Sequence, residues 1–220
     1  MIPAHIEHIV RTQIVQTCRR LQDEGLVVGT AGNVSVRLDD GILITPSATA
    51  YETMDEDDIC AVADDGRAID PPQSPSSELG LHLAAYAASP SANAVVHFHG
   101  RWSCAAAACI ADALPIIHYY AARLDAPVAV VPYAHFGSPE LAASVGGALT
   151  TRRAVLMANH GATVTGRTLK EAFENARLLE WLCRLHIDSG ASGKRLVLSD
   201  ADAGVVAETY ARRESKGRSR

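Results

Sequence analysis

The sequence predicts a single α/β domain in which a mixed or antiparallel sheet is flanked by helices. Segments with helical and with strand periodicity are intermixed along the chain without strict βαβ alternation. A length of 220 residues is long for one domain and short for two. We assign residues 1–211 to that domain. Residues 212–220 are basic and lack apolar anchors, which predicts a frayed, disordered tail.

In the first part of the chain, apolar residues recur at helical spacing up to Gly25, a plausible stop. Two β-like segments then flank the turn Asp39-Asp40-Gly41, which is typical of a hairpin. The predicted elements here are a helix at about 5–24, strands at 34–37, 42–44 and 59–62, a loop at 71–75, and a helix from Ser76 or Ser77 to about 88.

The second part of the chain alternates apolar runs with amphipathic segments. Its last long segment begins at Thr168 and keeps a helical period over several turns. The predicted elements are a strand from Ala94 through His97, a helix at about 102–110, a strand at 128–131, a helix at 139–149, strands at 154–158 and 162–164, and a long helix from Thr168.

Composition restricts the classes of function. The formal net charge of −5 argues against a general nucleic-acid or membrane surface. A local cluster of backbone N–H groups, arginines or a metal could still bind a small anionic substrate. The five cysteines are odd in number and form no CxxC pair, which favours a reduced, cytoplasmic protein. We find neither a signal-peptide pattern nor an apolar stretch of membrane-spanning length.

The tripeptide His97-Phe98-His99 ends an apolar run and is the strongest chemical signal. Alternate side chains of a strand point to the same face, so two histidines at i and i+2 can share one metal ion. A third candidate, His160, follows another apolar run. Three histidines that leave one position open are typical of catalytic zinc, although strand-end histidines can also simply be capped by backbone groups.

Pro75-Ser76-Ser77-Glu78 lies where a helix is expected to start. Free N–H groups and hydroxyls at such a start can bind a phosphate, although an ordinary N-cap is an equally good interpretation of the tetrapeptide alone. Glu78 precedes the histidine strand and could be a fourth metal ligand or a proton carrier. The turn Gly29–Asn33 is a second possible anion cradle, with Asn33 as a donor.

The lysines and one tyrosine restrict the kinds of carbonyl reaction that the chain could catalyse. The chain has three lysines, Lys170, Lys194 and Lys216, and none has the desolvated setting of a Schiff-base lysine. Carbonyl chemistry would therefore use metal activation. Tyr119 could act as an acid or hydrogen-bond donor, with core or interface packing as the default interpretation.

Six blocks in a fixed order resemble the class II aldolase/epimerase family, over residues 5–210. They are GTAGNVSVR (29–37), ITPSATAYE (44–52), PSSELGLH (75–82), NAVVHFHG (93–100), IIHYY (116–120) and NHG (159–161). The resemblance implies a central, mostly antiparallel sheet and a cyclic homotetramer with active sites between subunits.

The resemblance also implies roles for individual residues. His97, His99 and His160 would bind zinc (Mn²⁺ or Co²⁺ also suit imidazole), with Glu78 as fourth ligand and then as catalytic acid/base. Tyr119 would assist at the aldehyde end. The substrate phosphate would be held by Gly32, Asn33, Ser47, Ala48, Ser76 and Ser77. At the positions of Ser47 and Ala48, the phosphate turn of the family usually has Thr-Gly. The family also has a tyrosine near its C-terminus that comes from the neighbouring subunit, and Tyr210 is only a near match to it.

The implied activity is a zinc-dependent, reversible cleavage of a ketose 1-phosphate to dihydroxyacetone phosphate and an aldehyde. The substrate would be L-fuculose 1-phosphate or a related deoxy- or methylthio-ketose phosphate. A decarboxylase of 3-oxo-tetronate 4-phosphate type or a sugar-phosphate 4-epimerase could use the same metal site. The family's epimerases carry Asp where this chain has Glu78, which favours aldol cleavage. A non-enzymatic, adducin-like interaction module is the remaining alternative, and relatives of that kind lose the metal ligands.

Overall fold

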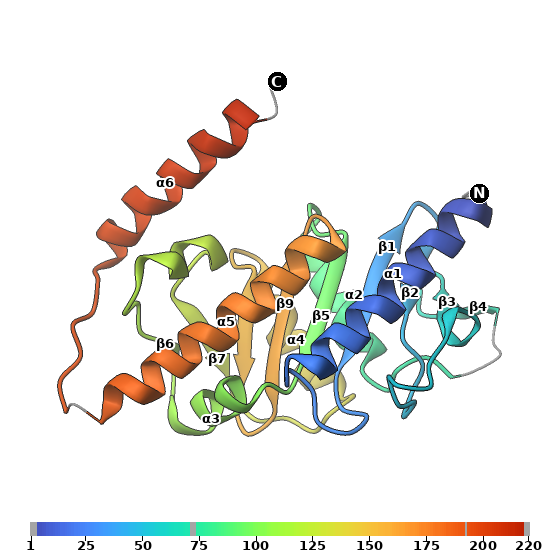
Figure 1. Ribbon diagram of the computed structural model, residues 1–220, viewed down its shortest axis with the longest axis horizontal. Helices are drawn as coiled ribbons and strands as arrows, with labels where there is room; N and C mark the ends of the chain where they lie inside the picture. Colours follow the sequence, from blue (N-terminus) through green and yellow to red (C-terminus); the bar gives the residue numbers. More distant parts are fainter. Residues whose placement is uncertain (1–3, 71–73, 192, 218–220) are drawn as a thin grey trace.

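The computed structural model describes residues 4–70, 74–191 and 193–217, and Figure 1 shows its elements. In chain order they are α1 (Ala4–Asp23), β1 (Asn33–Leu38), β2 (Gly41–Ile44), η1 (Glu56–Asp58), β3 (Cys60–Val62), β4 (Ala68–Asp70), α2 (Leu79–Ala88), β5 (Ala94–Phe98), α3 (Arg101–Cys109), β6 (Ala113–Leu114), η2 (Tyr119–Leu124), β7 (Val128–Val131), α4 (Pro139–Leu149), β8 (Ala154–Met157), β9 (Gly161–Gly166), α5 (Leu169–Gly190) and α6 (Asp200–Gly217).

The strands form one sheet in the order β4-β3-β2-β1-β5-β9-β8-β7-β6. Neighbouring strands are antiparallel except β7 and β8, so the predicted mixed, mostly antiparallel sheet is confirmed. In the centre of the sheet, Asn33 of β1 lies opposite His97 of β5, and His97 lies opposite Thr163 of β9. This register places residues from three segments that are far apart in the sequence beside one another, near one end of these central strands.

Helices cover both faces of the sheet. α1, α3 and α5 pack on one face and α2 and α4 on the other, as Figure 1 shows. The first layer encloses the larger core, which includes Phe98 and Phe173, and the second encloses a core that includes Leu81 and Met157. The alternating strand residues therefore bury apolar side chains on both faces, which explains the continuous apolar runs seen in the sequence.

The start of α2 differs from the prediction. The helix begins at Leu79 and not at Ser76 or Ser77, with Glu78 at its N-cap position. The Ser76 N–H donates to the carbonyl of Thr45 at 3.1 Å, and Pro75 forms a bridge with Pro46. These contacts tie the two serines to the end of β2 and keep them out of the helix. Residues 71–73 of the predicted loop lie outside the described residues.

The short strands β4 and β6, the 3-10 helices and α6 were not expected from the sequence, because each carries few apolar residues in a period. In Figure 1, α6 projects away from the sheet and contacts η2. It continues to Gly217, past Arg212, where the sequence places the start of a tail, and residues 218–220 lie outside the described part. Among the described helices, none is long and apolar enough to cross a bilayer.

Candidate functional site

Four potential metal ligands converge at one edge of the sheet. His97 is on β5, His99 follows that strand, His160 lies in the turn before β9, and Glu78 stands at the N-cap of α2. Glu78 Oε2 lies 2.9 Å from His97 Nε2, Glu78 Oε1 lies 3.4 Å from His160 Nε2, and the two Nε2 atoms of His97 and His99 are 2.9 Å apart. All four ligand atoms lie within 4.8 Å of one another.

This arrangement fits a tetrahedral divalent ion. Ligand bonds of 2.0–2.1 Å place neighbouring ligand atoms about 3.3 Å apart, which is close to the distances seen here. His97 Nδ1 lies 2.9 Å from the carbonyl of Ala162, so Nδ1 donates its proton there and Nε2 turns its lone pair to the cluster. Glu78 Oε1 is buried and has no hydrogen-bond partner among the described residues. This is expected for a carboxylate oxygen that binds a cation.

Electrostatics keep Glu78, His99 and His160 in their metal-binding forms. Burial opposes ionisation of Glu78, but neighbouring His97, the Asn33 amide and His160 outweigh burial and hold the pKa of Glu78 well below its usual range. Burial lowers the pKa of His99 to about 3, helped by the nearby His97 and His160, and burial also lowers the pKa of His160. At neutral pH the cluster therefore offers a carboxylate at Glu78 and neutral imidazoles at His99 and His160.

The turn before β1 brings a backbone and an amide close to this cluster. Gly32 has φ +97°, and a Cβ there would lie 2.9 Å from Val27 Cγ1 and 3.0 Å from the carbonyl oxygen of His97. Only glycine combines that backbone conformation with such a close approach. The next residue, Asn33, is 5% exposed, and its Nδ2 donates to Glu78 Oε2 at 3.1 Å.

A cavity of about 570 Å³ opens above the cluster. Glu78, His99 and His160 line it, whereas His97 is fully buried behind them. All six residues predicted to hold a phosphate also line the cavity: Gly32, Asn33, Ser47, Ala48, Ser76 and Ser77. Ala48 adopts the left-handed conformation, with φ +54°, where the family's usual Gly would be unstrained.

One predicted site residue lies elsewhere, and several residues that line the cavity were not predicted as site residues. Tyr119 lines a separate hollow of about 410 Å³ between η2 and α6, together with Tyr210. Tyr133 and Phe136 are 64% and 56% exposed and line the metal-site cavity, as does Asn159. The two aromatic residues lie in a loop without secondary-structure periodicity, where only their unusual exposure, a property of the fold, marks them.

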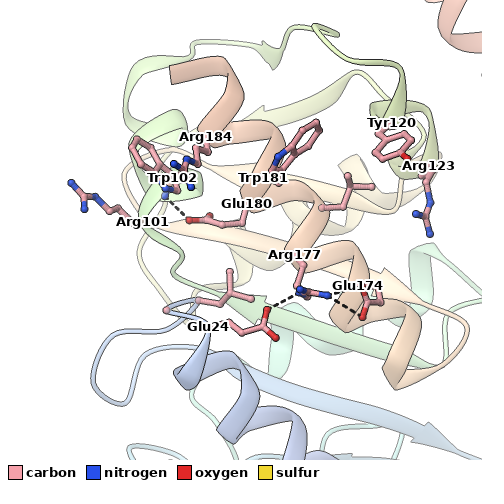
Figure 2. A pocket seen from close by; sticks show the side chains of 13 residues that line it. Glu24, Arg101, Trp102, Tyr120, Arg123, Glu174, Arg177, Glu180, Trp181 and Arg184 are labelled. Carbon is pink, nitrogen blue, oxygen red and sulfur yellow. Dashed lines mark hydrogen bonds and ion pairs between the residues drawn. The ribbon is translucent and has the colours of Figure 1, made fainter. Parts of the chain in front are cut away.

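A second groove, of about 650 Å³, lies between the ends of α1 and α3 and the side of α5. Figure 2 shows that Arg177 lies between Glu24 and Glu174 and forms an ion pair with each of them. Glu180 accepts from the backbone N–H groups of Trp102 and Ser103 at 2.7 and 2.8 Å. Because α3 starts two residues after His99, this carboxylate holds the segment that carries His99.

Comparison with known proteins agrees with this site. Residues 12–187 match the model of the class II aldolase and adducin N-terminal domain family. The chain is 39% identical over 200 residues to the L-fuculose phosphate aldolase of Escherichia coli K12, a match that covers 90% of this chain and 92% of that relative.

Two further proteins that resemble this chain are also named as sugar-phosphate aldolases. A 5-methylthioribulose-1-phosphate/5-deoxyribulose-1-phosphate aldolase of Escherichia coli O45:K1 is also 39% identical over 200 residues, with 90% of this chain and 93% of the relative covered. A solved L-fuculose 1-phosphate aldolase superposes with a TM-score of 0.89 at 29% identity and covers 96% of this chain and 98% of its own. Because the family model matches residues 12–187 and a relative at 39% identity covers 90% of the chain, this chain belongs to the class II aldolase and adducin family.

Proposed function

We propose that this chain is a metal-dependent aldolase that reversibly cleaves a ketose 1-phosphate to dihydroxyacetone phosphate and an aldehyde. The observation that carries the proposal is the convergence of Glu78, His97, His99 and His160 at the bottom of a cavity lined by hydroxyl and amide donors. The named aldolases that resemble the chain act on L-fuculose phosphate and on 5-methylthio- or 5-deoxyribulose 1-phosphate, and we extend that substrate class to this protein.

We propose that the three histidines and Glu78 hold Zn²⁺, with Mn²⁺ or Co²⁺ as alternatives, because imidazole suits all three. The ion would supply Lewis-acid polarisation of the substrate carbonyl and the adjacent hydroxyl. The chain's own task is to keep the ligands deprotonated and fixed. The bond from His97 Nδ1 to the carbonyl of Ala162 and the low pKa of His99 support that role.

Glu78 is proposed as the catalytic acid/base. Cleavage breaks the bond between C3 and C4 of the ketose, the C4 hydroxyl loses its proton, and C3 gains one, so the reaction is balanced in protons. Glu78, a carboxylate at neutral pH, would take up the proton that the C4 hydroxyl loses and would then deliver a proton to C3. Its position at the N-cap, with no side-chain capping bond, leaves the carboxylate turned toward the histidines and the cavity.

Asn33, Ser47, Ser76 and Ser77, with the backbone of Gly32 and Ala48, are proposed to hold the phosphate. All of these residues line the cavity, and they come from the start of β1 and the turn before it, the turn after β2 and the segment before α2. The aligned peptide dipoles at the start of α2 add a partial positive charge that favours an anion.

We propose a homotetramer with active sites between subunits, in which Tyr119 reaches the site of a neighbouring copy. Two observations support it: Tyr119 and Tyr210 share a hollow away from their own chain's cavity, and the cavity has exposed aromatic residues at its edge. Light scattering should give about four times 23.3 kDa. Mixing Glu78→Gln subunits with Tyr119→Phe subunits should restore part of the lost activity. A monomer in solution, or no restored activity, would contradict shared sites.

We further propose a reduced cytoplasmic setting and one catalytic domain over residues 1–211. None of the five cysteines forms a disulfide, which supports the first proposal. The second is supported by the family match, which ends before α6.

The direct test is a panel of L-fuculose 1-phosphate, 5-methylthioribulose 1-phosphate and 5-deoxyribulose 1-phosphate, assayed for dihydroxyacetone phosphate. Each assay is run with and without a chelator and after re-addition of Zn²⁺, Mn²⁺ or Co²⁺. We expect cleavage of at least one ketose phosphate, loss with chelator and recovery with metal. Cleavage that survives complete metal removal would contradict the proposal, and release of CO₂ from a 3-oxo sugar-acid phosphate without aldol cleavage would indicate a decarboxylase.

A further inference from the structure

A line of buried hydrogen bonds connects the middle of α2 with Glu78. The Tyr86 hydroxyl lies 2.8 Å from Ser35 Oγ, which lies 2.7 Å from His82 Nδ1. His82 Nε2 lies 2.5 Å from Asn33 Oδ1, and Asn33 Nδ2 lies 3.1 Å from Glu78 Oε2. Each of the five residues is at most 6% exposed, so no bulk water competes for these groups. The metal-site chemistry proposed above uses only the last two members of this line.

The residue types determine the direction of each bond. A carboxylate only accepts, so Asn33 presents Nδ2 to Glu78 and Oδ1 to His82. An amide oxygen also only accepts, which places the proton of His82 on Nε2. Complete burial favours the neutral imidazole, so His82 Nδ1 accepts from the Ser35 hydroxyl. Ser35 has then used its one proton and accepts from Tyr86. Every donor in the line has one acceptor.

We propose that His82 is a positioning residue that locks the Asn33 amide with its N–H group toward Glu78. An amide can turn by 180° with little change in shape, and the turned amide would set Oδ1 against the Glu78 carboxylate. His82 prevents this because its Nε2–H needs the oxygen. The lock also keeps the second hydrogen of Asn33 Nδ2 available at the cavity, and this consequence rests on the proposed phosphate site.

The tautomer of His82 gives a test that needs neither substrate nor metal turnover. Nitrogen-15 NMR of the histidine-labelled protein distinguishes a protonated from an unprotonated ring nitrogen, and the His82→Gln spectrum identifies the His82 signals. We expect the proton on Nε2 and a bare Nδ1, in metal-loaded and metal-free protein. A proton on Nδ1 would overturn the lock. Because this measurement is independent of aldol cleavage, it remains decisive if the ketose phosphate panel fails.

Two substitutions distinguish positioning from simple core packing. His82→Leu removes the donor, whereas His82→Gln places an amide N–H where Nε2–H was. Loss of a residue that orients a metal ligand's partner typically costs about 10–100-fold in activity, which we expect in kcat/KM for His82→Leu. Most of that loss should be recovered in His82→Gln. His186→Leu, which removes a buried histidine of α5, is the matched control and should keep kcat/KM.

Circular dichroism, thermal unfolding and metal analysis confirm that the compared variants are folded and loaded. The two variants can also be compared without turnover, by measuring the binding of inorganic phosphate to the metal-loaded protein. We expect weaker binding in His82→Leu than in His82→Gln. A folded His82→Leu with wild-type kcat/KM and phosphate affinity would overturn the proposal. So would a His82→Gln variant that loses as much as His82→Leu. If His82→Leu does not fold, the His82→Gln comparison with wild type and the tautomer carry the test.

Discussion

The metal-site cavity and the groove beside α5 both place glutamates near nitrogen-bearing side chains but organise them in opposite ways. In the cavity, Glu78 is 6% exposed, and its carboxylate oxygens lie 2.9 Å from His97 Nε2 and 3.4 Å from His160 Nε2. In the groove, the Arg177 side chain is 47% exposed and already lies 2.6 Å from Glu24 and 3.2 Å from Glu174. The groove is the larger of the two, with about 650 Å³ against about 570 Å³.

The difference shows that neither size nor charge density identifies a site. Exposed ion pairs satisfy one another and contribute little, about 0–1 kcal/mol each. A buried carboxylate oxygen without a hydrogen-bond partner is costly unless something binds it. Convergence of buried donor atoms is therefore the informative property, and five experiments test this comparison, from the largest expected effect to the smallest.

Replacing one imidazole should abolish metal binding at the cavity. In His97→Ala the ligand that is fully buried and bonded to the carbonyl of Ala162 is lost. We expect bound metal to fall far below one ion per chain and activity to fall by at least about a thousand-fold, since Lewis-acid stabilisation is worth several kcal/mol. His8→Ala, on the exposed side of α1, is the control. Full metal occupancy in His97→Ala would contradict the conclusion that the converging buried donor atoms form the metal site.

Glu78→Gln should retain the fold and bound metal but lose about 10²–10⁴-fold in kcat, because a positioned acid/base contributes about that factor. Gln keeps the size of the side chain and cannot exchange the proton. The matched control is Glu174→Gln, which removes a carboxylate from the groove and should leave kcat unchanged. Near wild-type cleavage in Glu78→Gln would exclude the acid/base role.

Acid should destabilise the metal-free protein through the buried histidine His82. Burial lowers its pKa from 6.5 to about 3, so below about pH 6.5 the unfolded chain binds a proton that the folded chain does not. Stability from this group is complete above pH 6.5 and is lost as the pH falls toward 3, about 2 kcal/mol between pH 7 and pH 5. Urea unfolding at both pH values measures it. His82→Gln should reduce the difference, and His8→Gln should not.

Ala48→Gly should stabilise the protein by roughly 0.5–1 kcal/mol, because alanine at φ +54° is strained and glycine is not. The shift in the urea midpoint measures the effect. Ala142→Gly within α4 is the opposite control and should destabilise, since glycine weakens a helix. Equal destabilisation by both substitutions would show that the left-handed turn carries no strain.

Arg177→Gln should change stability by less than about 1 kcal/mol and leave the activity intact, because exposed ion pairs are screened by solvent. Thermal unfolding and the cleavage assay at low and high salt measure both quantities. A loss of activity comparable to that of Glu78→Gln would mean that the groove, and not only the cavity, belongs to the active site.

Several features of this protein followed from the sequence alone. The hairpin around Asp39–Gly41, the histidine strand and the long helix after Thr168 are set by local chemistry: residues at strand or helix period, a turn and a cap. His97 and His99 approach a common point because they are two residues apart at the end of a strand. The apolar run before His160 and the position of Glu78 before the histidine strand indicated two further candidates, and the family resemblance grouped all four in one site.

Only the tertiary structure decided how distant segments meet. Asn33 and Glu78 are 45 residues apart in the chain, and their contact depends on the register of β1 against β5 and on the packing of α2. The tertiary structure also starts α2 at Leu79, places Tyr119 away from its own chain's cavity and leaves Phe136 exposed at the cavity's edge. Local patterns report neighbours along the chain, whereas register and packing depend on the energy of the whole assembled core.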